Sequence, residues 1–186
     1  MSEDVDQAAQ VLRGGGVIAY ATEAVFGLGC DPQNRHAIEK LLQLKRRPAH
    51  KGLILIAANE RQLHPYLQLA AITPATWAKV RASWPGPVTW LLPAAPQVSS
   101  WLRGEHDTLA VRVSAHAQVC ALCEAFDGPL VSTSANRSDQ APAKQLDEVI
   151  AEFDGEIDLV LVGETGGADK PSEIRDGRTG KIIRAG

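Results

Sequence analysis

A short basic segment offers the clearest chemistry in this sequence. Lys45, Arg46, Arg47 and Lys51 bring four cations into one short stretch. Like charges this close repel one another, whereas a phosphate chain binds well to several fixed Lys and Arg groups. We therefore expect an anion-binding site here, and the alternative is a solvated basic turn. Pro48 disfavours a helical backbone at the residue before it, so the connection should be stiff.

A second candidate site is a run of hydroxyl and amide side chains. Ser132, Thr133, Ser134 and Asn136 follow the apolar pair Leu130–Val131, which is typical of a buried strand. Ligands in open α/β sheets bind beyond the carboxyl ends of strands, so we expect these polar groups to line a cavity. No Ser-His-Asp arrangement is visible around them, and we assign no nucleophile. The alternative role is capping and turn formation.

Polar groups also follow the strand-like run 17–20. Thr22 and Glu23 come shortly after it, and Gly27 and Gly29 would allow the backbone to approach a ligand closely. The alternative is a plain strand–turn–strand connection. The chain contains no Gly-x-x-x-x-Gly-Lys-Ser/Thr motif, so this stretch is not a P-loop.

Arg112 interrupts the apolar run 109–113, which otherwise predicts a buried strand. A charged side chain in a core strand is costly unless it is paired or binds a ligand. We therefore expect Arg112 to bind a ligand or, as the alternative, to bridge a surface carboxylate. Cys120 and Cys123 lie one turn apart in an expected helix, and no second pair would complete a zinc site. They predict buried thiols.

The elements that position these groups alternate along the chain. Helical patterns occur at 5–12, 34–44, 61–63, 73–84, 119–126 and 146–153, and strand patterns at 17–20, 53–57, 88–92, 109–113, 130–131 and 159–162. Residues 94–107 are expected to be irregular, and a hairpin over 172–184 follows the last strand. This alternation predicts one α/β domain over residues 1–186, with a mixed sheet and flanking helices.

Composition narrows the class of protein. The chain has 186 residues, of which 45% are hydrophobic and 22% are charged, as in ordinary soluble domains. With a net charge of −3 the protein has no positive potential over its whole surface, so contact with RNA would need a local patch of basic residues. The apolar runs are too short for a membrane span, the acidic N-terminus does not resemble a signal peptide, and three cysteines do not make a disulfide framework. We expect a cytoplasmic protein without membrane contact.

Four stretches together resemble the YrdC-like family. These are Tyr20–Glu23 with Gly27–Gly29, Lys45–Pro48, Ser132–Asn136 and Ser172–Arg175. The match extends over nearly the whole chain, and its order and spacing are most similar to the bacterial members that form threonylcarbamoyl-AMP. The sequence departs from the common pattern at Ala21, where many members have Pro, at Val113–Ser114, where many read Arg-x-Pro, and at Ile56, where larger relatives have His. We carry over no contacts at those positions.

The resemblance implies a twisted α/β fold with a concave, positively lined cavity. It implies a nucleotidyltransferase that converts L-threonine, bicarbonate and ATP into L-threonylcarbamoyladenylate and pyrophosphate, the first step of N6-threonylcarbamoyladenosine formation beside the anticodon of tRNA. ATP would be a substrate with Mg²⁺ on its phosphates, and no metal-ligating residue of the chain is implied. The expected partners are a downstream tRNA threonylcarbamoyl-transfer complex and, through weak contact, tRNA itself. The expected state is a monomer.

Eleven residues receive roles through this resemblance. The implied catalytic set is Lys45, Arg47, Ser134 and Asn136. The implied substrate-binding set is Thr22, Arg112, Ser132 and Ser172. The implied ATP-binding set is Arg47, Lys51, Thr108, Ser134 and Arg184. These residue types suit the reaction, because it requires alignment and charge stabilisation and no protein nucleophile.

Two other functions would use the same features. An RNA-binding protein, for instance one that assists ribosome assembly, could use the same basic cavity, and a strict need for threonine and bicarbonate would distinguish the two. A carbamoyl-transfer domain, as in the related hydrogenase-maturation carbamoyltransferase, is the other alternative. That protein carries additional zinc-finger and acylphosphatase-like regions, for which we expect no room in 186 residues.

The adjacent residues Arg46 and Arg47 are expected to face different surroundings. Pro48 should extend the backbone at Arg47, and side chains of an extended chain alternate between two sides. We therefore expect Lys45 and Arg47 to face the cavity, and Arg46 to face solvent or tRNA.

Overall fold

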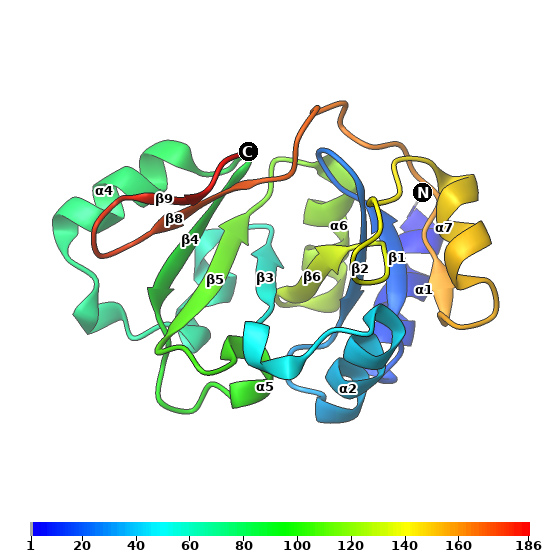
Figure 1. The fold of residues 1–186 in the computed structure, drawn as a ribbon, viewed down its shortest axis with the longest axis horizontal. Helices are drawn as coiled ribbons and strands as arrows, with labels where there is room; N and C mark the ends of the chain where they lie inside the picture. The colour runs from blue at the N-terminus through cyan, green and yellow to red at the C-terminus, as the bar shows by residue number, and fades with distance from the viewer. Residues whose placement is uncertain (1) are drawn as a thin grey trace.

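Nine strands form one continuous mixed sheet in the computed structural model, which describes residues 2–186 (Figure 1). In chain order they are β1 (Ile18–Ala21), β2 (Phe26–Cys30), β3 (Ile54–Ala57), β4 (Val88–Pro93), β5 (Thr108–Val113), β6 (Leu130–Ser134), β7 (Leu159–Val160), β8 (Glu173–Asp176) and β9 (Ile182–Arg184). Across the sheet the order is β7-β1-β2-β6-β3-β5-β4-β8-β9. The pairs β1/β7, β3/β5 and β4/β8 are parallel, and the other neighbours are antiparallel. The α/β class and the mixed sheet predicted from the sequence are confirmed.

Helices and short 3-10 turns flank this sheet. The helices are α1 (Ser2–Arg13), α2 (Arg35–Lys45), α3 (Glu60–Leu63), α4 (Pro74–Ser83), α5 (Ser100–Arg103), α6 (Ala117–Phe126) and α7 (Leu146–Phe153), and the turns are η1 (Ala49–Lys51), η2 (His64–Tyr66) and η3 (Leu69–Ala71). The helix starts predicted near residues 34 and 73 are confirmed, and Asn59 caps the short helix α3. The side chains of Asn34, Asn59 and Thr73 each accept a hydrogen bond from a backbone N–H three residues later, at 3.1, 3.3 and 3.1 Å respectively.

The sheet separates two hydrophobic cores. Side chains alternate between the two faces of a strand, so Leu55 packs into the larger core and its neighbour Ile56 into the smaller one. Residues of α1 and α6 complete the smaller core, and residues of α2 and α7 belong to the larger one. Because β3 is buried on both faces, its sequence is continuously apolar, and this is why the strand was visible in the sequence.

Two local structures differ from the sequence prediction. The strand expected to end at Val131 continues to Ser134, because residues 132–134 pair with residues 27–29 of β2. Its hydroxyl side chains therefore lie on a central strand and not beyond its end. Residues 94–107 are not irregular throughout, since α5 begins after Ser99, whose hydroxyl accepts a hydrogen bond from the Trp101 N–H at 3.2 Å.

A long connection carries the end of the chain from one edge of the sheet to the other. Segment 161–172 leaves β7 near one edge and passes the loop between β1 and β2 before it reaches β8 near the other edge (Figure 1). The N–H groups of Gly166 and Ala168 donate to the carbonyls of Thr22 and Glu23, both at 2.9 Å, and attach the connection to that loop. No helix within residues 2–186 is long and apolar enough to cross a membrane.

Candidate active site

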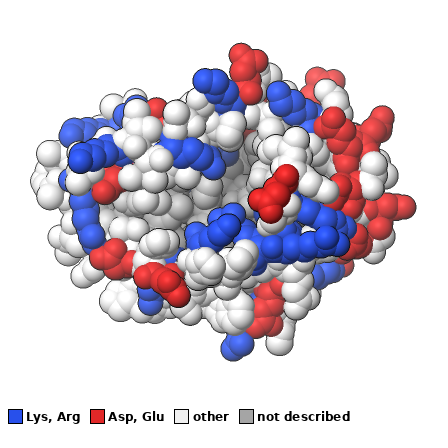
Figure 2. Space-filling view, viewed as in Figure 1, with Lys and Arg blue, Asp and Glu red and all other residues white. Residues whose placement is uncertain are grey.

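A cavity of about 460 Å³ lies over the central strands. Its walls come from the loop between β1 and β2, the segment after α2, strands β5 and β6, and residues 170–172 with β9. Figure 2 shows the hollow near the centre of the molecule, with Lys and Arg side chains around it. The structure therefore brings the basic segment and the hydroxyl-rich strand to one place.

The cavity is strongly enriched in positive charge. Its cationic lining residues are Arg47, Lys51, Arg103, Arg112, Lys170 and Arg184. Glu23 is the one carboxylate among the described lining residues. Because the chain as a whole carries a net charge of −3, this cluster is a local feature that favours an anionic ligand.

The cations also act on one another. Burial, and then the nearby charge of Arg184, lowers the pKa of Arg47. Burial, and then the charge of Arg112, lowers the pKa of Arg184 in the same way. The Nε atom of Arg47 is buried and has no hydrogen-bond partner among the described residues. An anion between these groups would relieve their mutual repulsion and provide acceptors for their N–H donors.

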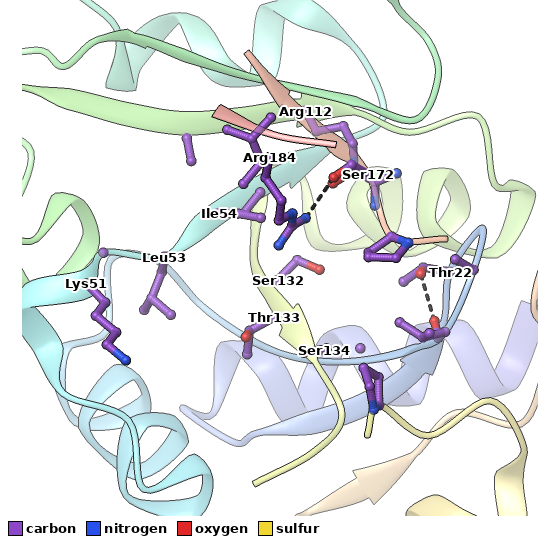
Figure 3. A pocket seen from close by; sticks show the side chains of 18 of the residues that line it. Thr22, Lys51, Leu53, Ile54, Arg112, Ser132, Thr133, Ser134, Ser172 and Arg184 are labelled. Atoms are coloured by element: carbon purple, nitrogen blue, oxygen red, sulfur yellow. Dashed lines mark hydrogen bonds between the residues drawn. The ribbon is translucent and has the colours of Figure 1, made fainter. Parts of the chain in front are cut away.

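The basic segment reaches the cavity through a sharp exit from α2. Arg47 directs Nη2 to the carbonyl oxygen of Gly52 at 3.1 Å, and Lys51 is the last residue of η1. Figure 3 shows that Lys51 and Arg184 approach the cavity from different sides, and that Ser132 on β6 lies near Arg184. Cations from distant parts of the chain thus surround a space in which hydroxyl groups form part of the wall.

Arg112 forms a buried ion pair with Glu23. Its Nη1 atom lies 2.7 Å from Glu23 Oε2. Glu23 Oε1 accepts hydrogen bonds from the Ser114 hydroxyl at 2.7 Å and from the Ala115 N–H at 3.2 Å. Burial alone would raise the pKa of Glu23, but the charge of Arg112 and the hydrogen bonds from Ser114 and Arg112 outweigh it and lower this pKa. The alternative expectation was that Arg112 bridges a surface carboxylate. The structure does pair it with a carboxylate, but this carboxylate, Glu23, lines the cavity, and so does Arg112.

Hydroxyl groups complete the walls. The Thr22 hydroxyl donates to the Val25 carbonyl at 2.7 Å, and the Ser172 hydroxyl lies 2.9 Å from that of Thr89. Arg184 Nη2 donates to the Ser172 carbonyl at 2.7 Å. These contacts fix three elements relative to one another and leave polar atoms at the cavity surface.

The structure brings nine of the eleven predicted site residues to the cavity wall. They are Thr22, Arg47, Lys51, Thr108, Arg112, Ser132, Ser134, Ser172 and Arg184. The two others, Lys45 and Asn136, are not among the lining residues, and the expectation that they face the cavity is wrong.

Lys45 and Asn136 instead hold the turn after β6. Lys45 lies in the last turn of α2, is 3% exposed, and donates from Nζ to the carbonyls of Ser134 at 2.5 Å and Asn136 at 2.7 Å. The Asn136 carboxamide donates to the carbonyls of Arg137 at 2.7 Å and Gln140 at 3.0 Å. Burial, and then the charge of Arg47, lowers the pKa of Lys45 to about 8. Both side chains therefore position Ser134, which does line the cavity.

Arg46 is exposed and lies outside the cavity wall, as expected, but for a different reason. The backbone is not extended from Lys45 onward, because Lys45 is still helical and Arg46 ends the helix in the left-handed conformation with φ 50° and ψ 41°. The N–H of Arg46 donates to the Gln43 carbonyl and closes the helix end. This reversal, and not the alternation of an extended chain, directs Arg46 and Arg47 to different sides.

Three basic lining residues were not found from the sequence. Arg103, His106 and Lys170 also lie at the cavity wall. Arg103 and His106 belong to the stretch expected to be irregular, and Lys170 lies in a loop, so no periodic pattern indicated their orientation. Cys120 and Cys123 are free thiols in α6, and Cys123 is buried as expected while Cys120 is half-buried. Residues 2–186 contain no group of three or more His, Cys, Asp or Glu side chains that could hold a metal ion.

Comparisons with known proteins cover nearly the whole chain. A family model of the Sua5/YciO/YrdC domain, described as "Telomere recombination", matches residues 10–186. The chain is 50% identical to the threonylcarbamoyl-AMP synthase of Vibrio parahaemolyticus, with 99% of this chain and 100% of that protein covered. It is 55% identical to the protein of the same name from Halorhodospira halophila, with 97% and 93% covered.

A solved structure shares the fold. The crystal structure of P. abyssi Sua5 complexed with L-threonine matches with a TM-score of 0.89 and 30% identity over 95% of this chain. The match covers 51% of that protein, so this chain spans about half of its length. The family model covers nearly all of the sequence, and two relatives are at least half identical over almost their entire length. The chain therefore belongs to the Sua5/YciO/YrdC family.

Proposed function

We propose that this chain catalyses the formation of L-threonylcarbamoyladenylate from L-threonine, bicarbonate and ATP, with release of pyrophosphate. The observation that carries the proposal is the cavity itself, in which six cations surround hydroxyl groups contributed by distant segments. Relatives named threonylcarbamoyl-AMP synthase share about half of the sequence, and the similar Sua5 structure contains L-threonine.

The reaction has two bond-forming steps. The amine of threonine first attacks the carbon of bicarbonate and gives a carbamate, with loss of water. An oxygen of this carbamate then attacks the α-phosphorus of ATP, and the bond to the bridging oxygen of pyrophosphate breaks. No covalent bond to the protein forms, so catalysis depends on holding the reactants in line and on stabilising the leaving group.

The nucleotide side of the site uses Arg47, Lys51 and Arg184. Negative charge accumulates on pyrophosphate as it leaves, and preorganised cations in a buried site stabilise this charge more strongly than water does. Thr108 contributes a hydroxyl at the same wall. We assign Ser134 to the same side, where β6 presents it to the cavity.

The amino-acid side uses Arg112 with the hydroxyls of Thr22, Ser132 and Ser172. A guanidinium has five N–H donors, and Glu23 occupies only part of this set. The remaining donors suit the carboxylate of threonine. Lys45 and Asn136 act through the turn after β6 and are positioning residues in this proposal, not residues that touch substrate.

Magnesium would enter with the nucleotide. Mg²⁺ keeps several water ligands and binds mainly to phosphate oxygens in many ATP-using sites. Because the described part of the chain offers no cluster of ligating side chains, we assign the ion to the phosphates of ATP and to water. The cavity cations would then share the charge of the polyphosphate with it.

The product would serve tRNA modification. A threonylcarbamoyl group activated as an adenylate is a donor for the adenosine beside the anticodon, and we propose transfer through a separate tRNA-modifying complex. We further propose that one domain over residues 1–186 acts as a cytoplasmic monomer. Exposed Arg46 is the residue of the basic segment best placed for weak contact with tRNA.

The identity of the product tests the proposal. Purified protein is incubated with ATP, Mg²⁺, threonine and carbon-labelled bicarbonate, and the nucleotides are separated and examined by mass spectrometry. We expect an adenylate that carries both the threonine and the labelled carbon, and no such species without threonine. An RNA-binding protein that uses the cavity only for phosphate would yield unchanged ATP.

A further inference from the structure

The backbone crossing between η1 and α5 has a geometry that favours glycine. Gly52 follows η1 with φ 66° and ψ 171°, and Gly104 follows α5 with φ 65° and ψ −140°. Other residues adopt such positive φ angles only at a cost in free energy. The two segments are in direct contact, because the N–H of Leu53 donates to the carbonyl of Leu102 at 2.7 Å.

A side chain would collide with the backbone at Gly104 and would be tightly crowded at Gly52. A Cβ atom on Gly104 would lie 2.2 Å from the His50 carbonyl oxygen and 2.8 Å from the Gly52 nitrogen. A Cβ atom on Gly52 would lie 3.1 Å from the Arg103 carbonyl oxygen. These neighbours are backbone atoms, which cannot rotate away as a flexible side chain can. We call this pair, Gly52 and Gly104, the glycine clamp.

Three cavity cations are attached directly to the glycine clamp. Arg47 directs Nη2 to the Gly52 carbonyl at 3.1 Å, and Lys51 precedes Gly52 in the chain. Arg103 precedes Gly104, and its guanidinium donates to the carbonyl oxygens of Val98 at 3.3 Å and His106 at 2.6 Å. All three cations line the cavity, so the distance between the two backbones sets the spacing of these charges.

Two other cations of the cavity are anchored elsewhere. Arg112 belongs to β5 and is held by Glu23, and Arg184 belongs to β9 and donates to the Ser172 carbonyl. Their positions depend on the sheet and not on the crossing of η1 and α5. A shift in the clamp should therefore move one group of charges and leave the other in place.

We propose that Gly52 and Gly104 are positioning residues that set Arg47, Lys51 and Arg103 as one group for the polyphosphate of the nucleotide. The proposal rests on the proposed function for the identity of that anion. A displacement of about 1 Å between charges and a reacting phosphate is enough to lower the rate ~100-fold in enzymes that depend on alignment. Gly104 thus contributes to catalysis from outside the cavity wall, whereas Gly52 is itself a lining residue.

The test variant is Gly104→Ala, and its matched control is Gly155→Ala. Gly104 is not among the described lining residues, so the new methyl group adds no atom to the cavity. Gly155 has φ 69°, similar to the φ of 65° at Gly104, but a Cβ atom there would meet nothing within 4 Å. The control therefore places alanine at a similar positive φ without the collision. Gly52→Ala is the milder second variant, since its closest neighbour lies at 3.1 Å, but it places its methyl group on a residue that lines the cavity.

Ligand binding and kinetics together separate positioning from general damage. Binding of ATP and of threonine is measured by calorimetry, and kcat/KM for each is measured by pyrophosphate release, all well below the melting temperature of each variant. For Gly104→Ala we expect kcat/KM for ATP to fall ~10-fold or more and direct ATP binding to weaken, while threonine binding changes less than about twofold. Gly155→Ala should match the native protein in ligand binding and in kcat/KM.

The possible outcomes distinguish this proposal from the proposed function. Equal losses for ATP and threonine in Gly104→Ala, or a loss in Gly155→Ala as large as in Gly104→Ala, would overturn the clamp. If Gly104→Ala does not fold, Gly52→Ala must show the same preference for ATP, and failure of both to fold would make the crossing a structural requirement instead. If the native protein binds ATP but forms no threonylcarbamoyladenylate, the proposed function is wrong, while ATP binding by the variants still decides the role of the clamp.

Discussion

Arg46 and Arg47 are adjacent and chemically identical, but they have different surroundings. Arg47 lines the cavity, and Arg46 is exposed on the left-handed end of α2. We predict that Arg47→Ala lowers kcat/KM for ATP by an amount equivalent to ~2 kcal/mol or more, as for removal of one preorganised donor. Arg46→Ala should cost less than ~0.5 kcal/mol, as for an ordinary surface change. Similar losses in the two variants, measured at one salt concentration, would mean that total charge matters and position does not.

The burial of Lys45 should make the free energy of unfolding depend on pH. Burial and the charge of Arg47 lower its pKa from 10.5 to about 8. Between these two values the unfolded chain binds more protons than the folded protein, so Lys45 makes the free energy of unfolding rise with pH over this window. We predict that the stability of the native protein relative to Lys45→Met increases from pH 7.5 to 9.5. Urea unfolding of both proteins across this range provides the measurement.

Other groups that titrate in this window occur in both proteins, so their contributions cancel in the difference. A difference in stability that does not change with pH would show that the folded protein keeps Lys45 at its ordinary pKa. It would also weaken the description of Lys45 as a desolvated positioning residue.

The sequence indicated residue types better than residue roles. The basic segment and the serine-rich stretch were visible because clustered cations and clustered hydroxyls are unusual. Whether Lys45 reaches substrate or backbone carbonyls depends on the turn after β6, which lies about ninety residues further along the chain. Such a contact leaves no pattern in the local sequence.

The turn after β6 is the element on which the Ser134 position depends. Asn136→Ala removes two donors to backbone carbonyls and disturbs the acceptors of Lys45. We predict that this variant loses ~1 kcal/mol of unfolding free energy, as for the loss of partly exposed hydrogen bonds, and that its turnover falls with it. Ser134→Ala should lower turnover with little change in melting temperature, because Ser134 lines the cavity. Thermal unfolding and pyrophosphate release of both variants provide the comparison.

Normal stability with strongly reduced turnover in Asn136→Ala would contradict this assignment. It would mean that the carboxamide contacts substrate directly, and that the turn is stable without it.

Helices and strands were predicted correctly where residues within or next to the element determine its structure. Asn34 and Thr73 cap helices through their own side chains, and the apolar run of β3 reflects burial on both faces. The extension of β6 to Ser134 was missed because it depends on pairing with β2, a partner far away in the sequence. The short helix α5 was missed for a similar reason, since it is too short for a periodic pattern and is stabilised by its contact with η1.

At the scale of the molecule, the distribution of charge indicates the anion-binding site, whereas the net charge does not. The chain carries a net charge of −3, yet six cations converge on one cavity. The composition excluded a positive potential over the whole protein that would attract nucleic acid. The concave site was expected only from the family resemblance. The convergence of Arg103, Lys170 and Arg184 could not be predicted from the residues alone, because it follows from the order of strands in the sheet.

Pyrophosphate release with each substrate omitted in turn tests the central claim most directly. The native protein is supplied with ATP, Mg²⁺, threonine and bicarbonate, and Arg47→Ala shows whether the release belongs to this cavity. We predict release only when ATP, threonine and bicarbonate are present together, and a much lower rate in the variant. Equal release without threonine, or undiminished release by Arg47→Ala, would contradict the account.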